Sequence, residues 1–227
     1  DAAVLQRLAS QASIALENAR LHANLQALSL TDPLTGLPNR RRLQIHLDKE
    51  VAAARRGRSL VVVVFDLDNF KPFNDLYGYG KGDEILLGLA QLLRELCDPR
   101  CDFVGHIGGD DFILVMQSDD WRERLHSLDN RFQQLCRTLY RAEHLQSRSF
   151  TAPDREGRWR SHDLLNLSIG ILPLIGSRAR QFDPARLAEL ASRAKHEAKR
   201  QRGFSLVIQD LPIDGLDGSE RHLNLCS

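Results

Sequence analysis

The chain has 227 residues, of which 42% are hydrophobic, and its formal net charge is +1. This length allows one sizeable core, and the balanced charge gives no reason to expect a nucleic acid or an anionic membrane as a partner. No apolar run reaches the roughly 18 residues of a membrane span. The four cysteines have neither zinc-site spacing nor disulfide-rich density, so we expect a reducing, cytoplasmic setting. The sequence begins without Met, and we take it as a piece of a longer protein.

The first 30 residues predict one uninterrupted helix, about 45 Å long. One stripe consists mostly of small residues and contains Leu8, Ala12, Ala15 and Ala19. A second stripe consists of large aliphatic residues and contains Ile14, Leu21, Leu25 and Leu28. Such a helix suits pairing with a second copy of the chain; packing on its own domain is the alternative. Residues 8–21 also resemble the last helix of a GAF sensor domain, which implies a GAF or other sensor upstream.

Residues 31–40 contain two prolines and a glycine and predict an ordered turn, followed by a helix to about Arg55. The valine-rich run from Leu60 to Asp66 predicts the most buried strand. Residues 69–84 are too rich in glycine and polar groups for a plain connector, and a helix over residues 86–97 follows, with Asp83 near its start. Strands over 103–107 and 112–116 then predict a hairpin with Gly108 and Gly109 at its tip.

The second half continues with an amphipathic helix over residues 121–139. Residues 143–162 are polar, with four arginines, and predict a long solvated loop. A strand over 164–172, a helix from Pro184 to about Arg202, a strand over 204–209 and a frayed tail complete the chain. This order predicts an α+β fold with a mixed central sheet flanked by helices. We divide the chain into a helix (1–30), a domain (31–210) and a tail (211–227).

Candidate chemistry lies where the two acidic strand ends meet. Asp66 and Asp110 offer hard oxygen ligands, which suit Mg²⁺ or Mn²⁺ bound together with phosphates. The carbonyl of Leu67 would complete such a shell. We expect Asp68 on the opposite face of the strand, with a structural role. Backbone N–H groups of residues 69–71 are placed to cradle phosphates.

Two further pairs of residues are candidates for binding a nucleotide. Lys195 and Lys199 are four residues apart on one helix face and would add positive charge to a triphosphate; a solvated helix face is the alternative. Asn74 and Asp83 suit a guanine base, because a carboxylate accepts from its adjacent N1–H and N2–H. Helix capping by Asp83 is compatible with this role.

The ordered motifs resemble the GGDEF, or diguanylate cyclase, family over about residues 29–210. The segments that match are residues 32–40, Asp66-Leu67-Asp68-Asn69-Phe70-Lys71, Asn74-Asp75, Tyr77-Gly78, Gly82-Asp83, Gly108-Gly109-Asp110-Asp111-Phe112 and Ser168-Ile169-Gly170. The resemblance implies a fold like the palm of polymerases and nucleotidyl cyclases, which is ferredoxin-like. It implies that a homodimer condenses two GTP into cyclic di-GMP and releases pyrophosphate.

The resemblance also implies residue roles. Metal would bind to Asp66, the Leu67 carbonyl and Asp110. Catalysis would use Asp110 and Asp111. Guanine would bind to Asn74 and Asp83, and the phosphates would contact Phe70, Lys71 and Lys199.

Some positions depart from the family pattern. The fourth signature letter is Asp111, where Glu is usual and longer by one methylene. Tyr79 replaces a His and His106 replaces an Arg, while the Gly-Arg order after Lys199 is shifted. The product-binding Arg-x-x-Asp window reads Pro99-Arg100-Cys101-Asp102, so we expect that site to be lost. A degenerate domain that binds GTP and regulates a partner is therefore the alternative function.

Overall fold

The computed structural model describes residues 6–7, 10–18, 20–21, 29–54, 56–153, 156–174, 184–200, 205–209 and 220–222. Its centre is a six-stranded sheet in the order β2-β3-β1-β6-β7-β8. Neighbouring strands run antiparallel except for β6 and β7, which are parallel, so the expected mixed sheet is confirmed. The strands are β1 (Leu60–Asp68), β2 (Phe103–Gly108), β3 (Asp111–Met116), β6 (Asn166–Leu174), β7 (Ser205–Gln209) and β8 (Glu220–His222).

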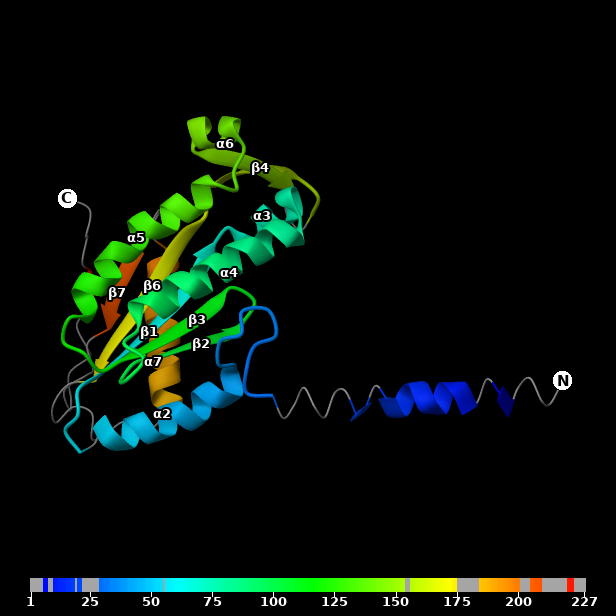
Figure 1. Ribbon diagram of the computed structural model, residues 1–227. Helices are drawn as coiled ribbons and strands as arrows, with labels where there is room; N and C mark the ends of the chain where they lie inside the picture. The colour runs from blue at the N-terminus through cyan, green and yellow to red at the C-terminus, as the bar shows by residue number, and fades with distance from the viewer. Residues whose placement is uncertain are drawn as a thin grey trace.

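Helices cover both faces of this sheet and make three layers (Figure 1). On one face, α4 (Tyr79–Leu96) and α5 (Trp121–Arg137) pack against a core that includes Val63 and Phe65 of β1. On the other face, α2 (Arg40–Ala54) and α7 (Pro184–Lys199) pack near Val62 and Val64. Because side chains alternate along a strand, a central strand covered on both faces must be apolar at every position. The unbroken valine run reflects this burial.

The turn before α2 is ordered by short-range bonds. Asp32 Oδ1 accepts hydrogen bonds from the backbone N–H and the hydroxyl of Thr35, both at 2.8 Å. Thr31 bridges to Pro38, and Gly36 has a φ of +65°, which glycine adopts at low cost. Upstream, residues 6–7, 10–18 and 20–21 are helical, as expected; the rest of the predicted 1–30 helix lies outside the described residues.

Residues 69–84 differ from the irregular connection expected from their glycines. They form α3 (Phe70–Tyr77) and the first turns of α4, joined at Gly78, which has a φ of +87°. Gly80 and Gly82 therefore lie inside a helix. Asp83 also lies inside α4, whose N-cap is Gly78, so the expected capping role of Asp83 is wrong.

The expectation of a solvated loop over residues 143–162 was also wrong. This stretch contains α6 (Ala142–Ser147) and a two-stranded sheet of β4 (Ser149–Pro153) and β5 (Trp159–Asp163). Phe150 and Ala152 are buried, and the Phe150 ring lies 6.0 Å from that of Tyr140. Two alternating buried positions within an arginine-rich stretch give too short a pattern to predict a strand.

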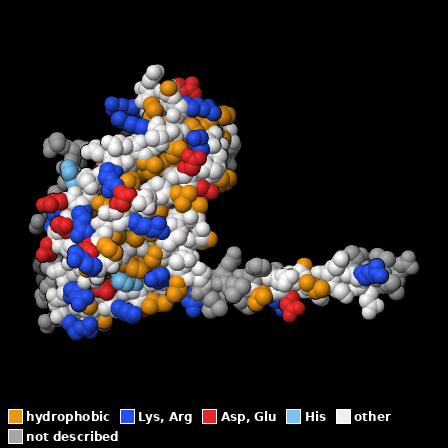
Figure 2. Space-filling model, in the orientation of Figure 1, with side chains coloured by type: hydrophobic (Ala, Val, Ile, Leu, Met, Phe, Trp, Pro, Cys, Tyr) orange, Lys and Arg blue, Asp and Glu red, His pale blue; other side chains and the backbone are white. Residues whose placement is uncertain are grey.

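The end of the chain shows smaller differences. Glu220–His222 pairs with β7 as strand β8, within the tail that we expected to be frayed. Residues 201–204, which include the predicted end of the last helix and the first residue of the predicted last strand, lie outside the described residues. In the described part of the chain, no helix has the length and apolar character to cross a membrane. Acidic and basic side chains are interspersed over the face in Figure 2.

Candidate functional site

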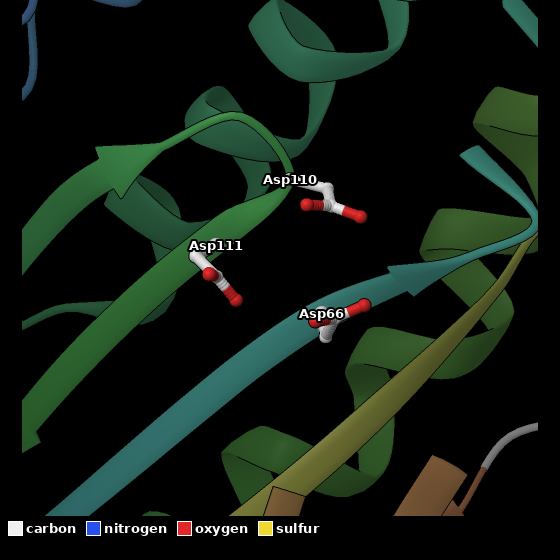
Figure 3. A group of neighbouring side chains, drawn as sticks. All are labelled: Asp66, Asp110 and Asp111. Carbon is white, nitrogen blue, oxygen red and sulfur yellow. The ribbon is translucent and has the colours of Figure 1, made fainter. Parts of the chain in front are cut away.

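Three carboxylates meet at the edge of the sheet where β1 ends and β3 begins. The two strands are antiparallel neighbours with Phe65 opposite Phe112, so Asp66 lies beside the tip of the β2–β3 hairpin. Asp110 stands in that tip, after Gly108 and Gly109, whose φ angles are +139° and +60°. One oxygen from each of Asp66, Asp110 and Asp111 lies within 4.8 Å of the others (Figure 3).

Two lysines of α7 face this cluster, which we call the acidic cluster (Asp66, Asp110 and Asp111). Lys195 Nζ lies 3.0 Å from Asp66 Oδ2 and also contacts Asp111 Oδ1. Lys199 Nζ lies 2.5 Å from Asp66 Oδ1. The Asp66 side chain is only 4% exposed, and partners of opposite charge offset the cost of burying a carboxylate.

Asp68 lies on the same side of β1 as Asp66, and the expectation of the opposite face was wrong. β1 continues through Asp68, and residues two apart on a strand share a face. Ser168 donates hydrogen bonds to both Asp68 oxygens, at 2.9 and 2.7 Å. Burial raises the pKa of Asp68 to about 6, and the negative charges of Asp66 and Asp110 add to this rise while the Ser168 bond opposes it.

The donor set of the acidic cluster fits a divalent cation. Burial raises the pKa of Asp110, and the charge of Asp66 raises it further, because like charges disfavour ionisation. A cation bound among these oxygens would relieve that repulsion, and carboxylate oxygens are the ligands that Mg²⁺ and Mn²⁺ prefer. Leu67 lies between Asp66 and Asp68, with its side chain in the core shared with α4; metal binding by its carbonyl stays a prediction.

The first turn of α3 begins directly after the acidic end of β1. Asn69 joins the two elements with a φ of +62°, a left-handed conformation that Asn tolerates better than most residues. Phe70 and Lys71 then open the helix, where backbone N–H groups have no helical acceptor and favour anions. The Lys71 ammonium pairs at 2.9 Å with Asp75, which lies four residues further along α3.

Close packing of α3 on α4 brings Asn74 against Gly82, the residue before Asp83. A Cβ at Gly82 would stand 1.9 Å from Asn74 Oδ1, so only glycine permits this approach. Asn74 Oδ1 is buried without a hydrogen-bond partner, and Asp83, the residue after Gly82, is exposed. A buried polar atom without a partner is unusual and fits a position that awaits a ligand.

His106 connects the turn before α2 to the signature hairpin, a link that sequence reasoning did not identify. Its Nδ1 lies 3.0 Å from Asp32 Oδ1, its Nε2 lies 3.0 Å from the Gly109 carbonyl oxygen, and its ring stacks on Phe112 at 4.3 Å. The only signal in the sequence was that a His stands where the family pattern has Arg. The contacts fix the backbone that carries Asp110.

Comparisons with known proteins agree with this architecture. Diguanylate cyclase DgcP of Escherichia coli K12 is 38% identical over 120 residues, which are 52% of this chain and 35% of that protein. The structure of diguanylate cyclase SiaD from Pseudomonas aeruginosa, in complex with its activator SiaC, has 27% identity and a TM-score of 0.58 and covers 90% of this chain and 72% of that one. A microbial GGDEF domain described as interacting with cyclic di-GMP has 27% identity and a TM-score of 0.57, covering 79% and 98%.

The chain spans only part of its curated relatives, 13% to 35% of the length of the first three compared. The match to a family model is more extensive. The model described as "Diguanylate cyclase, GGDEF domain" covers residues 29–204, from the turn before α2 to the start of β7. The chain therefore belongs to the GGDEF family of diguanylate cyclase domains.

Proposed function

We propose that this domain condenses two molecules of GTP into cyclic di-GMP, with release of pyrophosphate, at the interface of two copies. The observation that carries the proposal is the convergence of Asp66, Asp110 and Asp111 within 4.8 Å at one sheet edge. Family membership supports the reaction type. When bound there, Mg²⁺ or Mn²⁺ would neutralise charge on the phosphates and make the attacking hydroxyl more acidic.

Different residues of the chain would bind the cation and the triphosphate of one GTP. Asp66 and Asp110, with the Leu67 carbonyl, would hold the cation. The N–H groups at Phe70 and Lys71 and the ammonium of Lys199 would hold the triphosphate, because a helix N-terminus and a lysine both favour anions.

The base would bind between α3 and α4. Asn74 Oδ1 is buried without a hydrogen-bond partner. Asn74 packs against Gly82, and Asp83 is the next residue. Guanine offers adjacent N–H donors to Asp83 and further hydrogen bonds to the Asn74 amide. Asp110 and Asp111 would then face the ribose hydroxyl of the second GTP, which the other copy supplies.

A degenerate domain that binds GTP without turnover is the second candidate, favoured by one contact. Asp111 is shorter than the usual Glu, and its carboxylate is engaged by Lys195. One assay separates the two functions: incubation with GTP and Mg²⁺, followed by chromatography for cyclic di-GMP. We expect product. Metal-dependent GTP binding without product, even at protein concentrations that force dimers, would establish the regulatory domain instead.

A further inference from the structure

Lys195 contacts two of the three carboxylates that make up the proposed cation site. Its Nζ lies 3.0 Å from Asp66 Oδ2 and contacts Asp111 Oδ1 as well. Lys199 contacts only Asp66, through the other oxygen, and its side chain is 39% exposed against 21% for Lys195. The ammonium of Lys195 therefore bridges β1 and β3, as a bound cation would.

The backbone of Lys195 is held firmly against the sheet. A Cβ at Gly170 of β6 would stand 2.6 Å from the Lys195 backbone nitrogen, so α7 packs on β6 at the closest approach that glycine allows. Gly170 lies opposite Val64 in the β1–β6 pair, two residues before Asp66. The packing of the fold thus fixes the point from which the Lys195 side chain extends, within reach of both Asp66 and Asp111.

The ammonium also has room to leave Asp66 without leaving the protein. Lys195 and Asp111 lie on the wall of a cavity of about 340 Å³ between α2, α7 and the sheet, lined otherwise mainly by apolar side chains such as Leu43, Val64 and Ile113. A lysine side chain has four flexible methylenes that pack well on such a wall. It can stay on Asp111 while it releases Asp66.

We propose that Lys195 occupies the cation position between Asp66 and Asp111 in the metal-free protein, and that a divalent cation must displace it from Asp66 to bind. Lys195 is then a positioning residue that keeps the carboxylates together and raises the concentration of divalent cation needed to fill the site. A cation sits about 2.0–2.1 Å from a carboxylate oxygen, while the ammonium needs about 2.8 Å, so the two compete for the same Asp66 oxygen. This inference rests on the proposed function, since it concerns the same site.

The test is a titration of wild type, Lys195→Met and Lys195→Gln with Mn²⁺ alone. The signal of the free ion in electron paramagnetic resonance measures how much Mn²⁺ is bound at each step. Removing the competing charge should tighten Mn²⁺ binding on the order of tenfold, the size of effect that groups next to metal ligands have. The melting temperature without metal should fall, because the carboxylates lose their counter-charge. Addition of Mn²⁺ should raise it more in both variants than in wild type.

Lys49→Met is the matched control. It removes the same charge from an exposed position on α2, away from the acidic cluster, and should leave the Mn²⁺ affinity at the wild-type value. Lys195→Gln keeps a hydrogen-bond donor and decides the question if the Met variant does not fold. Unchanged or weaker Mn²⁺ binding in the folded Lys195 variants overturns the inference. The proposed function fails by a different result, namely wild-type protein that neither binds GTP with Mg²⁺ nor forms product.

Discussion

Asp66 is the residue on which the proposed site depends most. Its carboxylate is 4% exposed, contacts both lysines and has an oxygen within 4.8 Å of oxygens of Asp110 and Asp111. Asp66→Asn keeps the shape and removes the charge. We expect isothermal titration to show that Mg²⁺-dependent GTP binding weakens at least about tenfold, as loss of a metal ligand requires.

Asp119→Asn is the control for this experiment, because it removes the same charge from an exposed residue that lies just before α5. Unchanged Mg²⁺ dependence in Asp66→Asn would contradict the assignment of the cation site. ATP tests the other end of the nucleotide: equal affinity for ATP and GTP would rule out Asn74 and Asp83 as the guanine-binding pair.

Asp32 should make the stability of the domain depend on pH. Burial raises the pKa of this carboxyl, but bonds from Thr35 and His106 outweigh burial, so the pKa is lowered overall. A carboxyl group whose pKa is lowered by folding stabilises the fold at pH values above its unfolded-state pKa of about 3.9. This stabilisation is lost as the pH falls through the folded-state pKa. In urea titrations, Asp32→Asn should cost about 1 kcal/mol at pH 7. The difference from wild type should shrink below about pH 4; an equal cost at pH 7 and pH 3.5 would contradict this.

The residues of the acidic cluster were predictable in part from the sequence. Asp66 and Asp110 follow a recognisable strand and a Gly-Gly turn, and adjacency of those strands was enough to bring them together. Asp68 was misplaced because it was assigned to the opposite face of a continuing strand, whereas residues two apart on a strand share a face. The bridge from Lys195 was not predictable, because it depends on how closely Gly170 lets α7 approach the sheet.

The packing of α7 on β6 gives a prediction at the scale of elements. In Gly170→Ala, the new Cβ would meet the Lys195 nitrogen at 2.6 Å and the Ala194 Cβ at 3.0 Å. Helix and strand must separate, which should lower the free energy of unfolding by about 1–3 kcal/mol. Gly80→Ala is the control, since no atom lies within 4 Å of its Cβ position and alanine favours a helix. Equal melting temperatures for the two variants would contradict the close-packing argument.

The link between α4 and β2 predicts the response to product. Asp102 Oδ2 accepts from Arg124 at 2.7 Å and from the Asp98 N–H at 3.0 Å, and Oδ1 accepts from the Gln117 N–H at 3.0 Å. The Arg position of the Arg-x-x-Asp motif is Pro99, and the neighbouring Arg100 pairs with Asp98, so neither half of a product-binding pair is available. In steady-state assays with added cyclic di-GMP, we expect no noncompetitive inhibition. A strong noncompetitive effect would show that product binds there after all.

Elements with a long, uniform pattern were predicted well, and short or mixed ones were not. The valine run of β1, the leucine faces of α4 and α5 and the Gly-Gly hairpin all follow from burial and turn geometry. The β4–β5 pair was missed because only Phe150 and Ala152 on β4 are buried, too few positions to show a period. α3 was missed because the glycines after it do not mark one irregular loop: Gly78 turns the chain between two helices, and Gly82 allows close packing against Asn74.

At the scale of the whole molecule, the three layers place the acidic cluster at one end of the central strands β1 and β3. Cyclic di-GMP contains two nucleotides, so under the proposed reaction each copy supplies one GTP and the two sites must face each other. The rate should then depend on how often two copies meet. The N-terminal helix offers a means of holding them, because Ile14 and Leu21 are 60% and 58% exposed and seven residues apart, the repeat of a coiled coil.

We therefore expect removal of residues 1–28 to lower the specific rate of cyclic di-GMP formation at nanomolar protein, and to make that rate rise with protein concentration. Ile14→Glu should act in the same way, because a charge in an apolar seam opposes pairing. Leu16→Glu adds the same charge at a position that is 59% exposed but two residues from Ile14, on another side of the helix, and should retain the full rate. If a chain that begins at Ser29 is equally active at nanomolar concentration, the helix does not bring the two halves of the reaction together, and the domains must pair through another surface.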